Sequence, residues 1–243
     1  MKKLMIAAAV AAIGSAVFAE GVESQNIVGY AGNNLQAAGS TLLTPQFINV
    51  GGGEMHIQDI KPQGDDTSDN VTLQTLDKYG FTLKSYTWIN WAGDNSDQEA
   101  WVDDSYAIVD DSFPSAMGLW IQGATDQQSI MSAGAVGIQD VCFSLCQGGS
   151  TALGNPFPVS INIQDILPEG PDCSDNVTIQ TLDKYGFTVS SYTWINWAGD
   201  NSDQEAWVDD GYSIVDIDFA AGQGLWVQGS SDEQLLRFPA PEL

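Results

Sequence analysis

Residues 68–104 read SDNVTLQTLDKYGFTLKSYTWINWAGDNSDQEAWVDD, and residues 174–210 repeat this stretch with three changes. The changes replace Leu73, Leu83 and Lys84 with Ile179, Val189 and Ser190. Weaker similarity continues on both sides, so the chain is an internal duplication. Each unit has the length of one small domain, which predicts a first module at 20–134 and a second at 135–243.

The local pattern inside each unit predicts β-structure. Apolar and polar residues alternate from Val71 to Leu76, and residues 81–91 are rich in aromatic and β-branched types without helical spacing. The turn-forming residues 77–80 lie between these runs and predict a hairpin. Further strands are expected at 106–109, 119–122 and 130–132, and single helical turns at 57–60 and 163–166. The predicted fold class is all-β, with two tandem small β-sandwich or open-barrel modules.

The first nineteen residues have the pattern of a secretory signal peptide. Lys2 and Lys3 precede an apolar run at 4–13, and small residues lead to a cleavage site after Ala19. The short, alanine-rich apolar run is typical of bacteria. We therefore expect a protein exported to the periplasm, the cell surface or the medium. No other segment is long and apolar enough to predict membrane insertion.

The charge of the chain limits its partners. The formal net charge is −25 at pH 7, with 32 acidic side chains against 7 basic ones. A surface this acidic repels phosphate groups, so nucleic acid is excluded as a partner. The same surface attracts cations and favours solubility outside the cell.

Three cysteines lie at the start of the second unit: Cys142, Cys146 and Cys173. On one strand Cys142 and Cys146 would be ~13 Å apart, which is too far for a disulfide. The sequence therefore leaves two interpretations. Either one of them pairs with Cys173, as an exported chain permits, or all three are small buried thiols.

Several motifs, two of them inside the exact repeat, resemble a poorly characterised group of exported bacterial β-repeat proteins. These are ESQNIVGY at 23–30, YTW at 86–88, AWVD at 100–103 and GQGLWV at 222–227, which the first copy replaces with AMGLWI at 116–121. The resemblance covers most of the mature chain. It implies export and β-repeat architecture, and it implies nothing about activity or ligand.

The segment 88–104, with its copy at 194–210, combines tryptophan rings with carboxylates and amides. Such rings stack on the apolar face of a sugar, while the polar groups bond its hydroxyls. The segment thus predicts a weak site for a glycan or surface polymer. Its residues would be Trp91, Asp94, Asp97 and Trp101 in the first copy, and Trp197, Asp200, Asp203 and Trp207 in the second. The alternative is that the rings fill a small β core.

The same segment supplies hard oxygen ligands for calcium. A weak site would use Asp94, Asp97, Glu99 and Asp103 in the first copy, and Asp200, Asp203, Glu205 and Asp209 in the second. Calcium is the only metal that the pattern suggests, and no other cofactor is expected. Solvated acidic turns explain the same residues without a metal.

Catalysis finds little support in the sequence. His56 is the only histidine, and the second copy has Asn162 in its place. We predict no catalytic residue and a non-enzymatic role in binding or scaffolding at the cell surface. The alternatives are a purely structural surface or matrix protein, a calcium-stabilised adhesion module and, last, a glycosidase with two carboxylates. Free sheet edges would also permit self-association.

Overall fold

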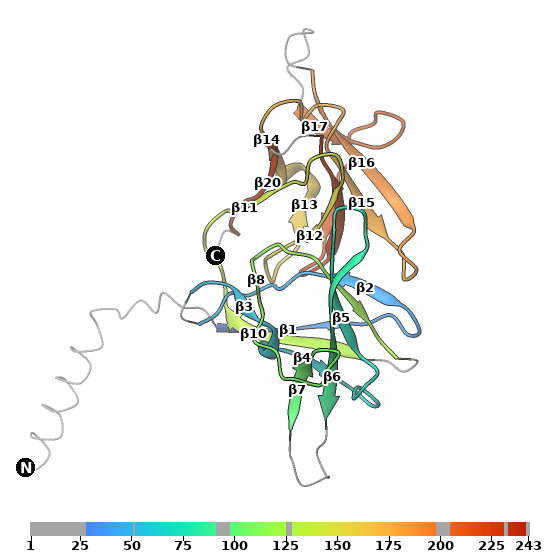
Figure 1. The fold of residues 1–243 in the computed structure, drawn as a ribbon. Helices are drawn as coiled ribbons and strands as arrows, with labels where there is room; N and C mark the ends of the chain where they lie inside the picture. Colours follow the sequence, from blue (N-terminus) through green and yellow to red (C-terminus); the bar gives the residue numbers. More distant parts are fainter. Residues whose placement is uncertain are drawn as a thin grey trace, which may run out of the picture.

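The computed structural model describes residues 28–50, 52–90, 98–124, 128–197, 205–230 and 233–241. Two β-modules follow one another in the chain and lie end to end (Figure 1). Within the described residues the only helical segments are two 3-10 turns, η1 (Ile57–Asp59) and η2 (Ile163–Asp165). The all-β prediction is therefore confirmed, and the helical turns lie where the sequence places them.

The strands of the first module are β1 (Val28–Asn34), β2 (Ser40–Leu43), β3 (Met55–His56), β4 (Ile60–Gln63), β5 (Thr72–Leu76), β6 (Thr82–Asn90), β7 (Glu99–Val102), β8 (Ser112–Phe113), β9 (Leu119–Gln122) and β10 (Ser129–Ala135). Those of the second are β11 (Val141–Ser144), β12 (Ser150–Gly154), β13 (Ile161–Asn162), β14 (Leu167–Glu169), β15 (Thr178–Leu182), β16 (Thr188–Asn196), β17 (Glu205–Val208), β18 (Asp218–Phe219), β19 (Gly224–Gln228) and β20 (Leu235–Phe238).

The two modules have the same topology. In the first, a five-stranded sheet has the order β2-β9-β5-β6-β7, a three-stranded sheet has the order β1-β10-β4, and β3 pairs with β8. In the second, the orders are β12-β19-β15-β16-β17, β11-β20-β14 and β13-β18. None of these sheets closes into a barrel within the described residues, so the arrangement is consistent with small β-sandwich modules.

The predicted hairpin is confirmed as β5 and β6, with a β-bulge between Thr75 and Leu76. The predicted strands at 119–122 and 130–132 correspond to β9 and part of β10. The strand expected at 106–109 is wrong, because there only Ile108 forms a bridge, to Val102. The Asp103 side chain accepts a hydrogen bond from the backbone N–H of Ala107, and the chain turns there instead of continuing as a strand.

Each module has its own core beneath the five-stranded sheet. In the first, Trp88 and Trp101 lie opposite each other on β6 and β7 and pack edge to face, with ring centroids 5.5 Å apart. Trp194 and Trp207 repeat this contact at 5.5 Å in the second module. The strict alternation of the strands directs these rings inward, and their burial is a large part of each small core.

The junction between the modules is built from reciprocal contacts. The backbone N–H of Gly118 donates to the carbonyl of Ala152 at 2.8 Å, and the N–H of Thr44 donates to the carbonyl of Gly222 at 3.0 Å. Ala116 of the first module also packs into the core of the second. The two modules are thus joined by backbone pairing and shared packing as well as by the chain.

Glycine is required where the backbones cross at this junction. A Cβ added to Gly224 would lie 2.4 Å from both the carbonyl oxygen and Cγ of Leu42. A Cβ on Gly118, in the first module, would lie 2.7 Å from the carbonyl carbon of Ala152. Contacts this short force the backbones apart, so the close approach depends on the missing side chain.

We expect Gly224→Ala to lower the free energy of unfolding by about 1 to 3 kcal/mol, as overpacking does in a close-packed interior. Gly137→Ala is the matched control, because its added Cβ would meet only Phe157, at 3.9 Å. Urea unfolding of both variants measures the difference. Equal stability of Gly224→Ala and the parent protein would contradict this expectation, because it would show that the two backbones can move apart at the junction without cost.

The three cysteines are all unpaired, so the predicted disulfide with Cys173 does not form in this structure. Cys142 is exposed, Cys146 is half-buried and Cys173 is buried. The other interpretation, in which all three cysteines are buried thiols, is therefore correct only for Cys173. Burial, together with the charge of Asp172, raises the pKa of the Cys173 thiol.

These environments predict an order of thiol reactivity. Because the thiolate is the reacting species, Cys142 should alkylate first at neutral pH and Cys173 last. Timed alkylation of the folded protein followed by peptide mass spectrometry measures the order. Recovery of a peptide that links Cys173 to Cys142 or Cys146 would contradict the unpaired arrangement.

Candidate functional site

The structure describes part of the predicted loop site. Trp91, Asp94, Asp97, Asp200 and Asp203 lie outside the described residues. The described members are Trp101, Trp197 and Trp207 among the rings, and Glu99, Asp103, Glu205 and Asp209 among the acids. The residues fall into three different environments.

Trp101 and Trp207 are core residues, which corrects their assignment to a ligand site. Both side chains have 0% exposed surface. The Nε1–H group of Trp101 donates to the carbonyl of Ile60 at 2.6 Å, and that of Trp207 donates to the carbonyl of Ile166 at 2.7 Å. A ring with no exposed surface and a satisfied N–H can neither stack on a sugar nor donate a hydrogen bond to it.

Trp197 forms an aromatic platform at the end of β16. It packs against a small apolar cluster of Ile195, Ala206 and Val208. Its ring also stacks on Tyr212, with centroids 6.3 Å apart and planes 24° from parallel. Trp197 is only partly buried and Tyr212 is 61% exposed, so the pair presents aromatic surface to solvent.

A strained turn holds Tyr212 in this position. Its backbone has the left-handed φ of 58°, which a bulky residue rarely adopts. The Oδ1 atom of Asp209 accepts from the N–H groups of Gly211 and Ser213, both at 2.9 Å. The surrounding hydrogen bonds therefore enforce a conformation that is unfavourable by itself, as is common at functional sites.

The first module repeats this turn. Tyr106 has a φ of 60° and is 59% exposed. The Oδ1 atom of Asp103 accepts from the N–H groups of Ser105 and Ala107, at 2.9 and 3.0 Å. Sequence reasoning missed both tyrosines. The available signal was the spacing Asp-x-x-Tyr, which occurs at the same place in both copies.

The described acids do not assemble into a metal centre. The Asn90 amide donates to Glu99 at 2.9 Å, and the Asn196 amide donates to Glu205 at 2.5 Å. Asp103 and Asp209 are engaged in their turns. Among the residues that the structure describes, no three His, Cys, Asp or Glu side chains are grouped to hold a metal ion. The calcium hypothesis therefore depends on the four aspartates outside this part of the chain.

His56 has polar neighbours but not the geometry of a catalytic triad. The Ser112 hydroxyl lies 3.1 Å and the Asp110 carboxylate 3.4 Å from the same ring atom, Nδ1. A triad requires the imidazole to bridge acid and nucleophile through its two nitrogens. In the second module the Asn162 amide makes the corresponding contacts, to Asp216 and Asp218, so the arrangement recurs without an imidazole.

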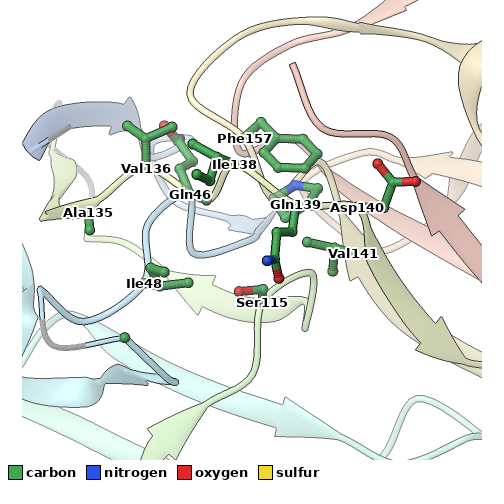
Figure 2. Close-up of a pocket in the computed structure, with 13 residues that line it drawn as sticks. Gln46, Ile48, Ser115, Ala135, Val136, Ile138, Gln139, Asp140, Val141 and Phe157 are labelled. Atoms are coloured by element: carbon green, nitrogen blue, oxygen red, sulfur yellow. The ribbon is translucent and has the colours of Figure 1, made fainter. Parts of the chain in front are cut away.

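A cavity of about 420 Å³ lies where the chain passes from one module to the other (Figure 2). Ile48, Val136 and Phe157 contribute apolar walls, and the side chain of Gln139 extends toward Ser115 (Figure 2). None of the predicted site residues lines it. This cavity is therefore separate from the loop site.

Comparison with known proteins adds no assignment. No protein-family model, no curated protein and no solved structure matches this chain. Within the described residues, no helix has the length and apolar character needed to cross a membrane.

The Asp103 turn makes a pH-dependent contribution to stability. Hydrogen bonds from the Ser105 hydroxyl, and from the N–H groups of Ala107 and Ser105, lower the pKa of Asp103. A lowered pKa in the folded state stabilises the fold above the unfolded pKa of about 4, and this contribution disappears as the pH falls through the folded value. Asp103→Asn should therefore be less stable than the parent protein at pH 7.

That difference should narrow as the pH falls below about 4. Thermal unfolding of both proteins between pH 7 and pH 3 measures it. Asp104→Asn changes the charge equally at the next residue and serves as control. A stability difference that stays constant with pH would contradict the role given to the Asp103 carboxylate.

Proposed function

We propose that this chain is an exported, non-enzymatic protein that binds carbohydrate weakly through one aromatic platform in each module. The observation that carries the proposal is the stacked pair of Trp197, which is partly exposed, and Tyr212, which is exposed, together with the strained turn that presents it. Backbone strain at a solvent-exposed aromatic residue needs a reason other than core packing. A sugar ring with apolar C–H groups on one face is a suitable ligand for such a surface.

The polar surroundings fit the same ligand class. Asn196 and Glu205 lie beside the platform on neighbouring strands and are bonded to each other. Amides and carboxylates of this kind exchange hydrogen bonds with hydroxyl groups. The repeat places the equivalent turn, with Tyr106, in the first module. Two weak sites on one chain would bind a polymer more tightly than either alone if both reach it.

A structural surface or matrix role is the second candidate. Phe81 and Phe187 are 70% and 71% exposed on the β5–β6 and β15–β16 hairpins. Exposed apolar side chains at equivalent places in both modules favour association between copies of the chain. Sedimentation velocity over a range of protein concentrations tests this role. Association that is lost in a Phe81→Ser/Phe187→Ser variant, without glycan binding, would favour it.

Removing the platform should weaken carbohydrate binding. We expect Trp91→Ala/Trp197→Ala and Tyr106→Ala/Tyr212→Ala each to weaken binding about tenfold or more, which corresponds to about 1.4 kcal/mol per site. Tryptophan fluorescence during titration with a panel of soluble glycans measures the affinity. Phe81→Ser/Phe187→Ser is the matched control, since it removes exposed aromatic rings elsewhere. No saturable response to any glycan in the parent protein would reject the proposed function.

A further inference from the structure

A groove of about 430 Å³ lies between the two modules, away from the platforms. Equivalent residues of the two repeats face each other across it. The first module contributes Trp120 and Tyr79, and the second contributes Trp226 and Tyr185. Both tryptophans are partly buried, whereas Tyr79 and Tyr185 are 65% and 66% exposed. The groove is therefore one composite site per chain that neither module has alone.

The walls of the groove are held by contacts between the modules. Cη2 of Trp226 lies 3.7 Å from the position of a Cβ on Gly80, in the hairpin turn of the first module. Trp120 meets Gly186 of the second module in the same way, at 3.6 Å. The backbone N–H of Ser150 donates to the carbonyl of Lys78 at 2.9 Å and anchors the first turn. A site fixed in this way loses little conformational entropy when it binds.

The polar groups of the groove are amides and hydroxyls. The Thr82 hydroxyl donates to Oε1 of Gln74 at 3.1 Å, and Thr188 donates to Gln180 at 3.2 Å. These bonds fix the amide orientation and direct the NH₂ groups away from the threonines. Within the described part of the chain the two NH₂ groups have no protein acceptor. They are available to donate to a ligand.

The groove is uncharged although the protein is strongly acidic. None of its lining residues is Asp, Glu, Lys or Arg, while the whole chain has a net charge of −25. A ligand in this groove therefore gains no ion pair from the walls. Four aromatic rings, with amide donors and hydroxyls between them, match a ligand that has apolar faces and uncharged hydroxyl groups.

We propose that this groove binds a neutral oligosaccharide, with one ligand per chain. The proposal is independent of the platform that is proposed for each module. The two halves of the groove contribute to the same ligand, so loss of either half should impair the whole site. Lys78 and Lys184 lie over the rings of Tyr79 and Tyr185 at the edge of the groove, at 5.2 and 5.0 Å, but do not line it. An acidic oligosaccharide of equal length should still bind more weakly, because the large net negative charge of the protein repels it.

The test is calorimetric titration of the full chain in the Trp91→Ala/Trp197→Ala background, which removes the platform tryptophans. The ligands are neutral oligosaccharides of glucose, xylose, mannose and N-acetylglucosamine, with a uronic acid oligosaccharide for comparison. We expect binding of at least one neutral ligand with a stoichiometry of one. Gln74→Ala/Gln180→Ala should weaken this binding about tenfold, and Trp120→Ala/Trp226→Ala should abolish it.

Gln122→Ala/Gln228→Ala is the matched control. It removes exposed amides from β9 and β19 that do not line the groove, and it should leave the affinity unchanged. Gln74→Ala/Gln180→Ala keeps the tryptophans at the junction, so it tests the site even if the tryptophan variant unfolds.

Three results would overturn the groove proposal. They are no binding of any neutral ligand in the platform-deficient background, a stoichiometry of two, and equal affinity of the Gln74→Ala/Gln180→Ala variant and its parent. The platform proposal is rejected by a different result, namely that Trp91→Ala/Trp197→Ala binds glycans as tightly as the parent chain does.

Discussion

The arrangement of each module depends on one partly buried glutamine. The Gln164 side chain donates to the carbonyls of Trp207 and Val215, at 3.0 and 2.6 Å, and accepts from the N–H of Trp207 at 3.1 Å. It thereby closes the loop that carries Tyr212 at both ends. Gln58 makes the same three bonds to Trp101 and Val109 in the first module. The side-chain amide makes the backbone hydrogen bonds that a neighbouring strand would otherwise make. It thereby satisfies backbone N–H and C=O groups that would be left unpaired without it.

The sequence predicts the strands better than it predicts the site, for physical reasons that particular residues make clear. Alternation around Leu73 and the turn at Gly80 depend on neighbours in the chain, and both are confirmed. Whether a tryptophan is buried depends on contacts far away in sequence. Trp101 is buried because Ile60 offers it a carbonyl 41 positions away, and no local pattern contains that information.

The contacts between the modules could not be predicted from the sequence, for the same reason. Trp120 and Trp226 were visible as members of a repeated motif, yet nothing in the motif indicates that each meets a glycine turn of the other module. The duplication predicts two similar units. It does not predict how the two units pack against each other or which site they form together. The groove and the glycine crossing at Gly224 arise only when the two units pack against each other.

The reciprocal junction also limits how this architecture grows. Each module contributes the same elements to the contact, with β2 and β9 of the first meeting β12 and β19 of the second. A self-complementary contact of this kind is satisfied by two partners and leaves no equivalent surface for a third. Solenoid repeats differ, because each unit stacks on the next through unlike faces and the array stays open. Further duplication of this gene segment would therefore favour even numbers of modules, added as closed pairs.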